Sequence, residues 1–312
     1  MRFRSGMDNN TEMRAYMVVI QLAGGLGNQM FQYALYWQLR SLGKDVKIDD
    51  VTGFEADVQR EPELDIYGIT YERPTQKELR KMLDSEPDLF HKVRRKLAGR
   101  NKRAYFEEDK RFKPEIFGWD DIYLEGYWQS EKYFEKVSGE LRRIYDTDRL
   151  LEKLGEQNNP FLEQITGTES VSVHIRRGDY LTPANEKLFG GICTESYYGK
   201  AMAEMEKRHP GCRYFVFTND KEGTNRFLKN ICVGIPADRI VMVDIPAGEH
   251  ADCLEFALMS KCGHNILANS SFSWWASYLN KNGDKTVLVP GRWLNGWDCS
   301  DFYRTDMQKV GQ

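Results

Sequence analysis

Short apolar runs alternate with longer helical stretches over most of the chain, and this pattern is most regular in the second half. Buried strands are predicted for 171–175, 214–217, 240–243, 265–268 and 286–289. The segments between them are predicted helices, at 194–208, 221–231, 251–262 and 271–281. Strands and helices in strict alternation favour a parallel sheet covered by helices on both faces. The second half is therefore expected to be an α/β lobe.

The first half begins with one β-α-β unit. An apolar strand is predicted for 17–22, a glycine-rich loop for 23–29, an amphipathic helix for 30–42 and a short strand for 46–48. Farther along, the predicted helices are 75–83, 88–97, 132–145 and 150–165, and 122–128 resembles a strand. Pro160 and Gly167 are helix breakers near a lobe boundary. We therefore expect a polar, disordered leader or expression remnant over 1–16, an N-terminal lobe over 17–165 and a C-terminal lobe over 166–312.

Composition limits the classes of function. The chain has 312 residues, a net charge of -3, 41% hydrophobic and 29% charged residues, as expected for an ordinary soluble protein of two domains. Nucleic acid is disfavoured as the main partner, because binding to its phosphate backbone normally requires a strong basic surplus. No run of residues approaches the roughly twenty apolar residues of a membrane span.

The cysteines indicate a reducing compartment, because none of the six forms a C-x-x-C pair or a compact disulfide spacing. Cys262 and His264 lack the further ligands that a zinc site needs. The sequence therefore predicts a cytoplasmic protein with free or buried thiols and no metal site.

Residues 265–279, NILANSSFSWWASYL, read as a buried strand that runs into a helix with a small, polar first turn. Backbone N–H groups in a first helical turn have no partner inside the helix, and the helix dipole adds positive charge there. A phosphate fits such a site, with Asn269, Ser270 and Ser271 as further donors. An ordinary Ser or Asn helix cap is the alternative.

A second candidate anion site is SVSVHIRRGDY at 170–180, where an alternating strand ends in Arg176 and Arg177. The carboxyl end of such a strand opens into the ligand crevice of an α/β protein. Guanidinium groups there can bind a diphosphate bidentately and stay charged at any working pH. A solvated Arg-Arg-Gly-Asp turn is the alternative.

The glycines at 24, 25 and 27 allow a tight turn and a close approach of the backbone to a ligand. A dinucleotide fingerprint would need a further glycine where Met30 stands, so a nicotinamide dehydrogenase is disfavoured although Asp49 and Asp50 lie at a suitable distance. A turn with only a packing role remains the alternative.

Residues 92–113 contain a local surplus of lysine and arginine. A solvated helix and loop is the default interpretation. Phe90, Val93 and Leu97 also allow a weak peripheral contact with the inner face of a membrane.

These segments carry a family resemblance. GGLGNQMFQYA at 24–34, HIRRGDY at 174–180 and LMSKCGHNILANSSFSWWASYLN at 258–280 together resemble the bacterial α-1,2-fucosyltransferases, family 11 of the glycosyltransferases. The resemblance extends from Met17 to about Asn295 in the family's order. It implies a GT-B-type α/β fold with two Rossmann-like lobes and a donor cleft between them. It also implies GDP-L-fucose as donor, a galactose-containing acceptor on the N-terminal lobe, inversion at the anomeric carbon, and no cofactor or divalent metal.

The resemblance also implies residue roles. Arg176 would stabilise the departing GDP, Arg177 would orient the strand end, and Asn28 would lie near the reacting sugar. The remaining donor-binding candidates are His174, Asn219, Asp220, Asn269, Ser270, Ser271, Phe272, Gly25 and Gly27. The family usually has an aspartate five residues before the serine of LMS, to read guanine, and this chain has Glu255 there. Asp252, one turn earlier, competes for that role, while helix capping is an alternative for Asn219 and Asp220.

The identity of the general base stays open. Asp179 is the nearest carboxylate in these motifs for direct displacement, but it could instead support Arg176 or Arg177, and the departing phosphate could accept the proton. Aromatic residues at 105, 106, 119, 123, 127 and 128 could stack on an acceptor sugar or simply pack in the core. The leading expectation is an inverting transferase to the 2-hydroxyl of a terminal galactoside, a galactoside 2-α-L-fucosyltransferase. A GDP-fucose-dependent enzyme of other linkage and a non-catalytic nucleotide- or glycan-binding protein are the alternatives.

Overall fold

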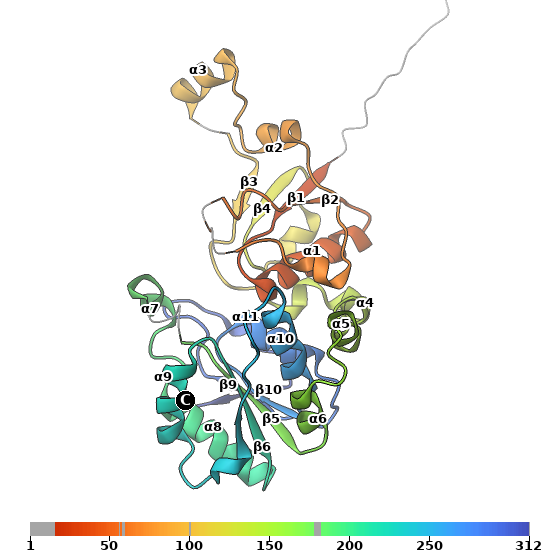
Figure 1. Cartoon of the computed structure of the whole chain (residues 1–312). Coiled ribbons are helices and arrows are strands. Elements are labelled where there is room, and N and C mark those ends of the chain that lie inside the picture. Colours follow the sequence, from red (N-terminus) through yellow and green to blue (C-terminus); the bar gives the residue numbers. More distant parts are fainter. Residues whose placement is uncertain (1–15, 56, 58–59, 100, 178–181, 312) are drawn as a thin grey trace, which may run out of the picture.

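The computed structural model describes residues 16–311 except 56, 58–59, 100 and 178–181. Two parallel sheets lie at opposite ends of the molecule, joined by helices (Figure 1). The N-terminal sheet has the order β2-β1-β4-β3, and the C-terminal sheet has the order β10-β9-β8-β5-β6-β7. The α/β class and the parallel sheet predicted from the alternating pattern are confirmed.

The N-terminal lobe is built around the predicted β-α-β unit. Its strands are β1 (Met17–Gln21), β2 (Asp45–Asp49), β3 (Ala104–Phe106) and β4 (Ile122–Glu125), and its helices are α1 (Leu26–Ser41), α2 (Gln76–Met82), α3 (Leu89–Ala98) and α4 (Ser138–Ile144). β1 is buried along its first four residues and pairs with both β2 and β4. The short β3, which the sequence analysis did not predict, completes the sheet edge.

The start of α1 corrects one prediction. The helix begins at Leu26 rather than at 30, so Gly27 and Asn28 belong to its first turn and not to a loop. Side chains of the helix itself hold the preceding segment: Gln29 Nε2 donates to the carbonyl of Gly24 at 2.8 Å, and Gln32 Oε1 accepts from the backbone N–H of Ala23 at 3.0 Å. These side-chain bonds fix the glycine-containing segment that immediately precedes the helix.

The C-terminal lobe matches the predicted alternation closely. Its strands are β5 (Ser170–Ile175), β6 (Arg213–Thr218), β7 (Ile240–Met242), β8 (His264–Ile266), β9 (Val287–Pro290) and β10 (Met307–Val310). Its helices are α7 (Pro183–Phe189), α8 (Glu195–Arg208), α9 (Lys221–Ile231), α10 (Ala251–Lys261) and α11 (Ser271–Leu279). β10 and α7 were not predicted. β5 is buried at every residue and lies in the middle of the sheet, so its carboxyl end opens inside the molecule.

Two helices lie between the lobes in sequence, α5 (Thr147–Leu154) and α6 (Pro160–Thr166). Both pack against α10 of the C-terminal lobe. The Ser260 hydroxyl donates to Thr147 Oγ1 at 2.9 Å, and Lys281 forms ion pairs with Asp146 at 2.9 Å and with Asp148 at 2.7 Å. The chain therefore reaches the C-terminal lobe before 166, and the exact boundary between the lobes stays a prediction.

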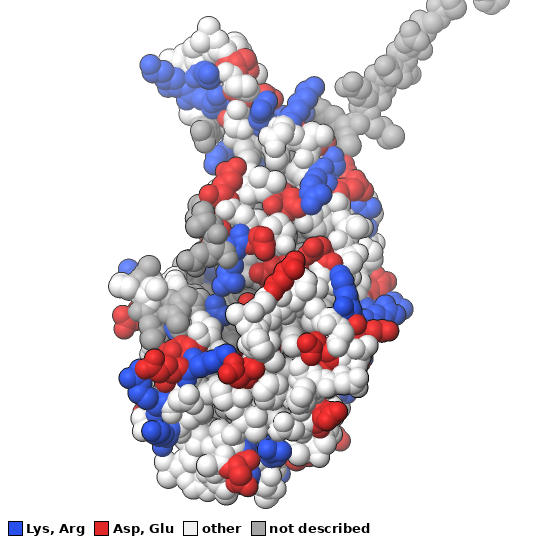
Figure 2. Space-filling model, in the orientation of Figure 1, with Lys and Arg blue, Asp and Glu red and all other residues white. Residues whose placement is uncertain are grey.

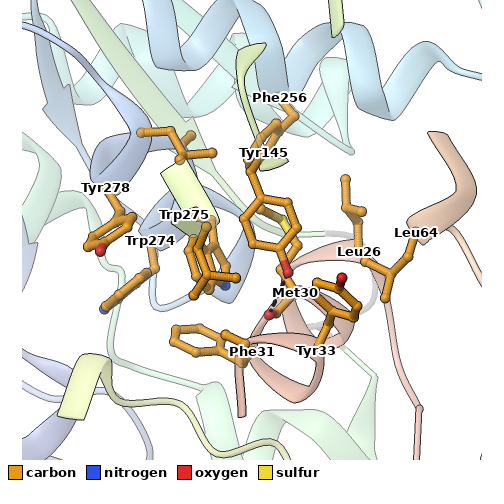
Figure 3. Packing of buried hydrophobic residues seen from close by; sticks show 14 of the residues in the cluster. Leu26, Met30, Phe31, Tyr33, Leu64, Tyr145, Phe256, Trp274, Trp275 and Tyr278 are labelled. Carbon is orange, nitrogen blue, oxygen red and sulfur yellow. Dashed lines mark hydrogen bonds between the residues drawn. The ribbon is translucent and has the colours of Figure 1, made fainter. Parts of the chain in front are cut away.

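An aromatic cluster, which we call the seam, joins the lobes (Figure 3). It consists of Phe31, Phe134, Tyr145, Trp274 and Trp275. The ring of Phe31, on α1, lies 4.6 Å from Trp274 and 4.9 Å from Trp275, both on α11. Phe134 stacks on Trp275 at 5.2 Å, and the Tyr145 hydroxyl donates to the carbonyl of Met30 at 3.0 Å. These rings are buried from water and form one hydrophobic core with both sheets.

The segment 132–145, predicted as one helix, is interrupted. It forms two short 3-10 turns, Glu131–Tyr133 and Glu135–Val137, before α4. Phe134 between them has φ -139° and ψ 19°, outside the helical range, and its ring is fully buried in the seam. Packing of this ring overrides the helical pattern.

No helix in the described part of the chain has the length and apolar character required to cross a bilayer.

Candidate active site

A cavity of about 650 Å³ lies where the two lobes meet. Residues from the start of α1, the carboxyl end of β5, α10 and the start of α11 line it together with irregular segments of the N-terminal lobe. The seam packs behind the same helices, since Phe31 belongs to α1 and Trp274 to α11. The cavity therefore has a rigid wall formed by both lobes.

The first turns of α1 and α11 touch through their backbones. A Cβ atom at Gly27 would lie 2.6 Å from the carbonyl carbon of Ser271 and 2.7 Å from the amide nitrogen of Phe272. Gly25 lines the cavity and lies close to Arg60. A Cβ atom added at Gly25 would lie only 3.2 Å from a guanidinium nitrogen of Arg60. Glycine at 27 is thus needed for the close approach of the two helix starts.

The start of α11 combines a helix cap with the cavity wall. Ser270 Oγ accepts from the backbone N–H of Phe272 at 3.3 Å, and Asn269 Nδ2 donates to the carbonyl of Trp293 at 3.0 Å. Asn269, Ser270, Ser271 and Phe272 all line the cavity. The helix is capped by serine and also directs its first turn toward the cavity, so the two interpretations considered for this segment are compatible.

The carboxyl end of β5 faces the same cavity. His174 is only 4% exposed, and its ring lies 5.8 Å from that of Phe272. Arg176 lines the cavity as well. The arginine predicted to bind a pyrophosphate and the helix start predicted to bind one therefore open on a single cavity.

Arg177 is directed elsewhere. Its Nε atom lies 3.5 Å from Asp220 Oδ2, its guanidinium lies 5.1 Å from the centre of the Phe227 ring, and its backbone N–H donates to Asn219 Oδ1 at 3.0 Å. Asp220 also caps α9 by accepting from the N–H of Gly223 at 2.9 Å. Asn219 lines the cavity, whereas Arg177 and Asp220 are not among its described lining residues. This arrangement suits Arg177 to orienting the strand end.

Two carboxylates from α10, Glu255 and Asp252, also line the cavity. Burial raises the pKa of Glu255 to about 7, and the negative charge of Asp252 adds to this effect. Lys221 and Arg176 lower the pKa of Glu255, so the guanidinium and the carboxylate influence each other across the cavity. Of the two candidates for reading guanine, Glu255 is the more buried.

The N-terminal lobe supplies a polar wall that the sequence analysis largely missed. Asn28, which was predicted, lines the cavity and accepts from Gln129 Nε2 at 2.6 Å. The unpredicted lining residues from this lobe include Asp57, Arg60, Glu63, Glu107, Lys110 and Gln129. Most come from irregular segments without hydrophobic periodicity, so no pattern identified them.

Only Tyr127 among the six aromatic residues considered for acceptor stacking is in the cavity lining described here. Tyr123 and Trp128 are each 1% exposed and belong to the core. Tyr127 is 38% exposed, and its backbone N–H donates to Glu107 Oε2 at 3.0 Å. Lys110 pairs with the same carboxylate at 2.8 Å.

Two further sets of carboxylates were weighed from the sequence. Asp179, the candidate general base, lies outside the described residues. Asp49 accepts from the hydroxyls of Thr52 at 2.6 Å and Tyr123 at 2.8 Å, and Asp50 pairs with Arg73 at 2.6 Å. Neither Asp49 nor Asp50 is in the described cavity lining, and both stabilise the segment after β2.

One cluster of metal-type ligands occurs among the described residues, at Glu169, His209 and His264, outside the cavity lining. The backbone N–H of Thr286 donates to His264 Nδ1 at 3.0 Å, which leaves the ring proton on Nε2, 2.7 Å from Glu169 Oε1. A metal at Nε2 would force that proton onto Nδ1, against the Thr286 N–H. The cluster is therefore suited to a structural hydrogen-bond network rather than to a metal site.

Two α/β lobes, each built on a parallel sheet, with a cavity where they meet are typical of a GT-B-type architecture. The family model described as Glycosyl transferase family 11 matches residues 83–304, so the chain belongs to glycosyltransferase family 11. It is therefore a glycosyltransferase, as the sequence motifs predicted.

Two named bacterial relatives are similar over most of their length. An Escherichia coli protein named alpha-1,2-colitosyltransferase is 28% identical over 92% of this chain and 95% of its own. The E. coli O-antigen biosynthesis glycosyltransferase WbnK is 27% identical over 88% and 94%. Among solved structures, POFUT1 in complex with GDP-fucose is 12% identical with a TM-score of 0.43, over 89% of this chain and 98% of that one.

Proposed function

We propose that this glycosyltransferase is an inverting α-1,2-fucosyltransferase that moves L-fucose from GDP-β-L-fucose to the 2-hydroxyl of a terminal galactoside. The observation that carries the proposal is the shared cavity, which both Arg176 and the first turn of α11 line. A diphosphate bound there would receive a fixed guanidinium and several backbone N–H groups at once.

In the proposed reaction, the bond between C1 of fucose and the β-phosphate oxygen breaks, and GDP leaves with the electron pair. The acceptor oxygen forms the new bond to C1 from the opposite face, which inverts the anomeric centre. Negative charge builds on the departing β-phosphate, where Arg176 would stabilise it in the role that a divalent metal has in other transferases. Asn28, fixed by Gln129, would orient the sugar or the attacking hydroxyl.

Nucleotide recognition would come from the C-terminal lobe. Ionised Glu255 can accept from N1–H and N2–H of guanine together, and Phe272 offers an apolar ring beside His174. Asn219 would bind the ribose or base. Gly25 and Gly27 would let the start of α1 approach the donor closely.

The proton of the acceptor hydroxyl needs a destination. Asp179 is the candidate general base, and the departing phosphate is the alternative acceptor. Replacement of Asp179 by asparagine separates them: unchanged turnover with intact donor binding would leave the phosphate route.

The acceptor is proposed to bind against the N-terminal wall of the cavity. Tyr127 presents a partly exposed ring there, next to the Glu107–Lys110 ion pair. Aromatic faces and charged hydrogen-bond partners are typical of sites for sugar hydroxyls.

Incubation with GDP-fucose and lactose tests the proposal directly, with GDP release as the rate and NMR of the product as the linkage. We expect an α-1,2-fucosyl-galactoside, and a rate unchanged by EDTA. A different linkage would retain the donor assignment and reject the acceptor assignment. Absence of turnover across an acceptor array, with GDP-fucose bound, would favour a non-catalytic binding protein.

A second donor is favoured by one relative. Because the E. coli relative covering most of this chain is named an alpha-1,2-colitosyltransferase, GDP-colitose should be compared with GDP-fucose in the same assay. A higher kcat/KM with GDP-colitose would replace fucose in the proposal and leave the cavity roles unchanged.

A further inference from the structure

Helix α3 carries its apolar side chains on the outside of the protein. Leu89, Phe90, Val93 and Leu97 are 76%, 73%, 49% and 83% exposed, and no residue of this helix is buried. At 100° per residue, these four positions fall within a stripe about 100° wide on one side of the helix. A surface helix normally turns such a stripe toward the core, so α3 has the reverse orientation.

The opposite side of α3 is fixed to the protein by charged groups. Arg95 is 15% exposed at its side chain and donates to the carbonyl of Glu86 at 2.8 Å. Arg94 forms an ion pair with Asp84, whose second oxygen accepts from the N–H of Asn101 at 2.8 Å. Asp88 caps the helix by accepting from the N–H of His91 at 3.0 Å. These contacts determine which side faces outward.

Lysines border the exposed stripe. The helix sequence LFHKVRRKLA contains basic residues and no acidic one, and Lys92 and Lys96 are exposed along one edge of the stripe. The nearby carboxylates Asp84 and Asp88 are engaged by Arg94 and His91. Figure 2 shows basic and uncharged atoms side by side at the top of the molecule, where α3 lies, with some acidic atoms next to them. An apolar stripe bordered by lysine is typical of helices that lie in a membrane interface.

We propose that α3 docks on a bilayer with anionic headgroups, with Leu89, Phe90, Val93 and Leu97 inserted at the boundary of the acyl chains. A second copy of the chain fits this surface poorly. Four side chains on a ten-residue helix provide little of the roughly 1,200 Å² that a stable interface buries, and two-fold pairing would bring like-charged lysines together. Lysine and anionic lipid attract each other, and each lysine near the surface should strengthen binding about fivefold.

The docked orientation leaves the cavity open. α3 lies at the end of the N-terminal lobe away from the C-terminal lobe (Figure 1), and none of its residues lines the cavity. Binding to a bilayer through α3 would therefore hold the acceptor-side lobe near the membrane without covering the site.

Co-sedimentation of the full chain with phosphatidylglycerol vesicles at low salt tests the proposal, with phosphatidylcholine vesicles alongside. We expect binding to the anionic vesicles that weakens as the salt concentration rises. The affinity of the Phe90→Ser/Leu97→Ser variant should be at least tenfold lower, because burial of each apolar side chain strengthens binding by about 10- to 100-fold. Lys92→Glu/Lys96→Glu should also lose binding.

The matched control is Val233→Ser, which removes an equally exposed apolar side chain, 82% exposed, from the other lobe. It should bind the vesicles as the unmodified protein does. Unaltered thermal unfolding of all variants would exclude a folding defect. Equal vesicle binding by the Phe90→Ser/Leu97→Ser variant would overturn the proposal, as would a dimer in size-exclusion chromatography that this variant alone disrupts.

Discussion

Arg176 is the residue whose replacement should affect the proposed chemistry most. Its guanidinium lines the cavity with the start of α11. Because additional negative charge develops on the leaving phosphate in the transition state, Arg176→Ala should lower kcat by about 10²–10³-fold, with a smaller change in donor KM. Arg176→Lys keeps the charge but loses the planar fork, so its activity should be intermediate.

The control for this variant is Arg226→Ala, which removes an arginine with a 77% exposed side chain that lies 3.9 Å from Glu222 on α9. Steady-state kinetics with GDP-fucose and lactose should show no effect of the control. Full activity in Arg176→Ala would reject the assigned role.

Glu255 should affect stability and donor binding in opposite directions. Burial raises its pKa from 4.5 to about 7 in the folded protein. The folded state therefore holds this proton more tightly than the unfolded state, and the resulting stability is complete below pH 4.5 and is lost as the pH rises through 7. Glu255→Gln has no such loss. The variant should match the natural protein in stability at low pH and exceed it by about 1–2 kcal/mol at pH 8.

The effect of Glu255 on donor binding is measured by calorimetric titration with GDP. Donor binding requires the ionised carboxylate, so GDP affinity of the unmodified protein should increase from pH 6 to pH 8, and Glu255→Gln should bind about tenfold more weakly at pH 8. Glu249→Gln, at an exposed position near the same helix, is the control and should change neither property. A Glu255→Gln variant with normal GDP affinity would transfer the guanine role to Asp252.

At the scale of elements, the contact between the starts of α1 and α11 depends on Gly27. A Cβ there would lie 2.6 Å from backbone atoms of Ser271, so one helix must move. We expect Gly27→Ala to lower the free energy of unfolding by about 1–3 kcal/mol and to weaken donor binding. Gly199→Ala, in α8 with nothing within 4 Å of the added atom, should be neutral or slightly stabilising. Equal behaviour of the two variants in thermal melts and GDP titrations would contradict this account.

Strands with a regular apolar pattern were predictable at this scale, and irregular segments were not. β5, SVSVHI, was identified by its alternation of apolar and polar residues, and β6, RYFVFT, by its apolar run; both are buried almost throughout. β10, MQKV, has two exposed polar residues at a sheet edge, and β3 lies inside a basic stretch, so neither has a strand pattern. The interrupted helix at 132–145 follows from burial of Phe134, a tertiary contact that no local spacing contains.

The same distinction applies to the cavity. Arg176 directly follows β5, and Ser270 and Ser271 lie where the chain passes from β8 into α11, so their convergence at one edge could be inferred from the parallel topology. Arg60, Glu107 and Gln129 come from segments whose course is determined by side-chain hydrogen bonds and packing between distant parts of the chain. Their place in the site required coordinates.

At the scale of the whole molecule, the seam should make the lobes unfold together. Phe134 contacts Phe31 from the N-terminal lobe and Trp275 from the C-terminal lobe. Phe134→Ala should cost about 3–5 kcal/mol, and calorimetry should still show one transition at a lower temperature. Phe134→Leu should cost less and retain the fold. Phe90→Ala, which truncates a ring that is 73% exposed, is the control. Two separate transitions in the Phe134 variants would mean that the lobes are independent.

The position of the seam also limits how substrates enter. A hinge motion that separates the two lobes would move Phe31 away from Trp274 and expose the buried rings of the seam to water. Nucleotide and sugar are therefore expected to enter where the cavity lining is exposed, for example beside Tyr127 and Trp297, which are 38% and 42% exposed. The turnover rate would then depend on small rotations of individual aromatic side chains, while the two lobes keep a fixed arrangement.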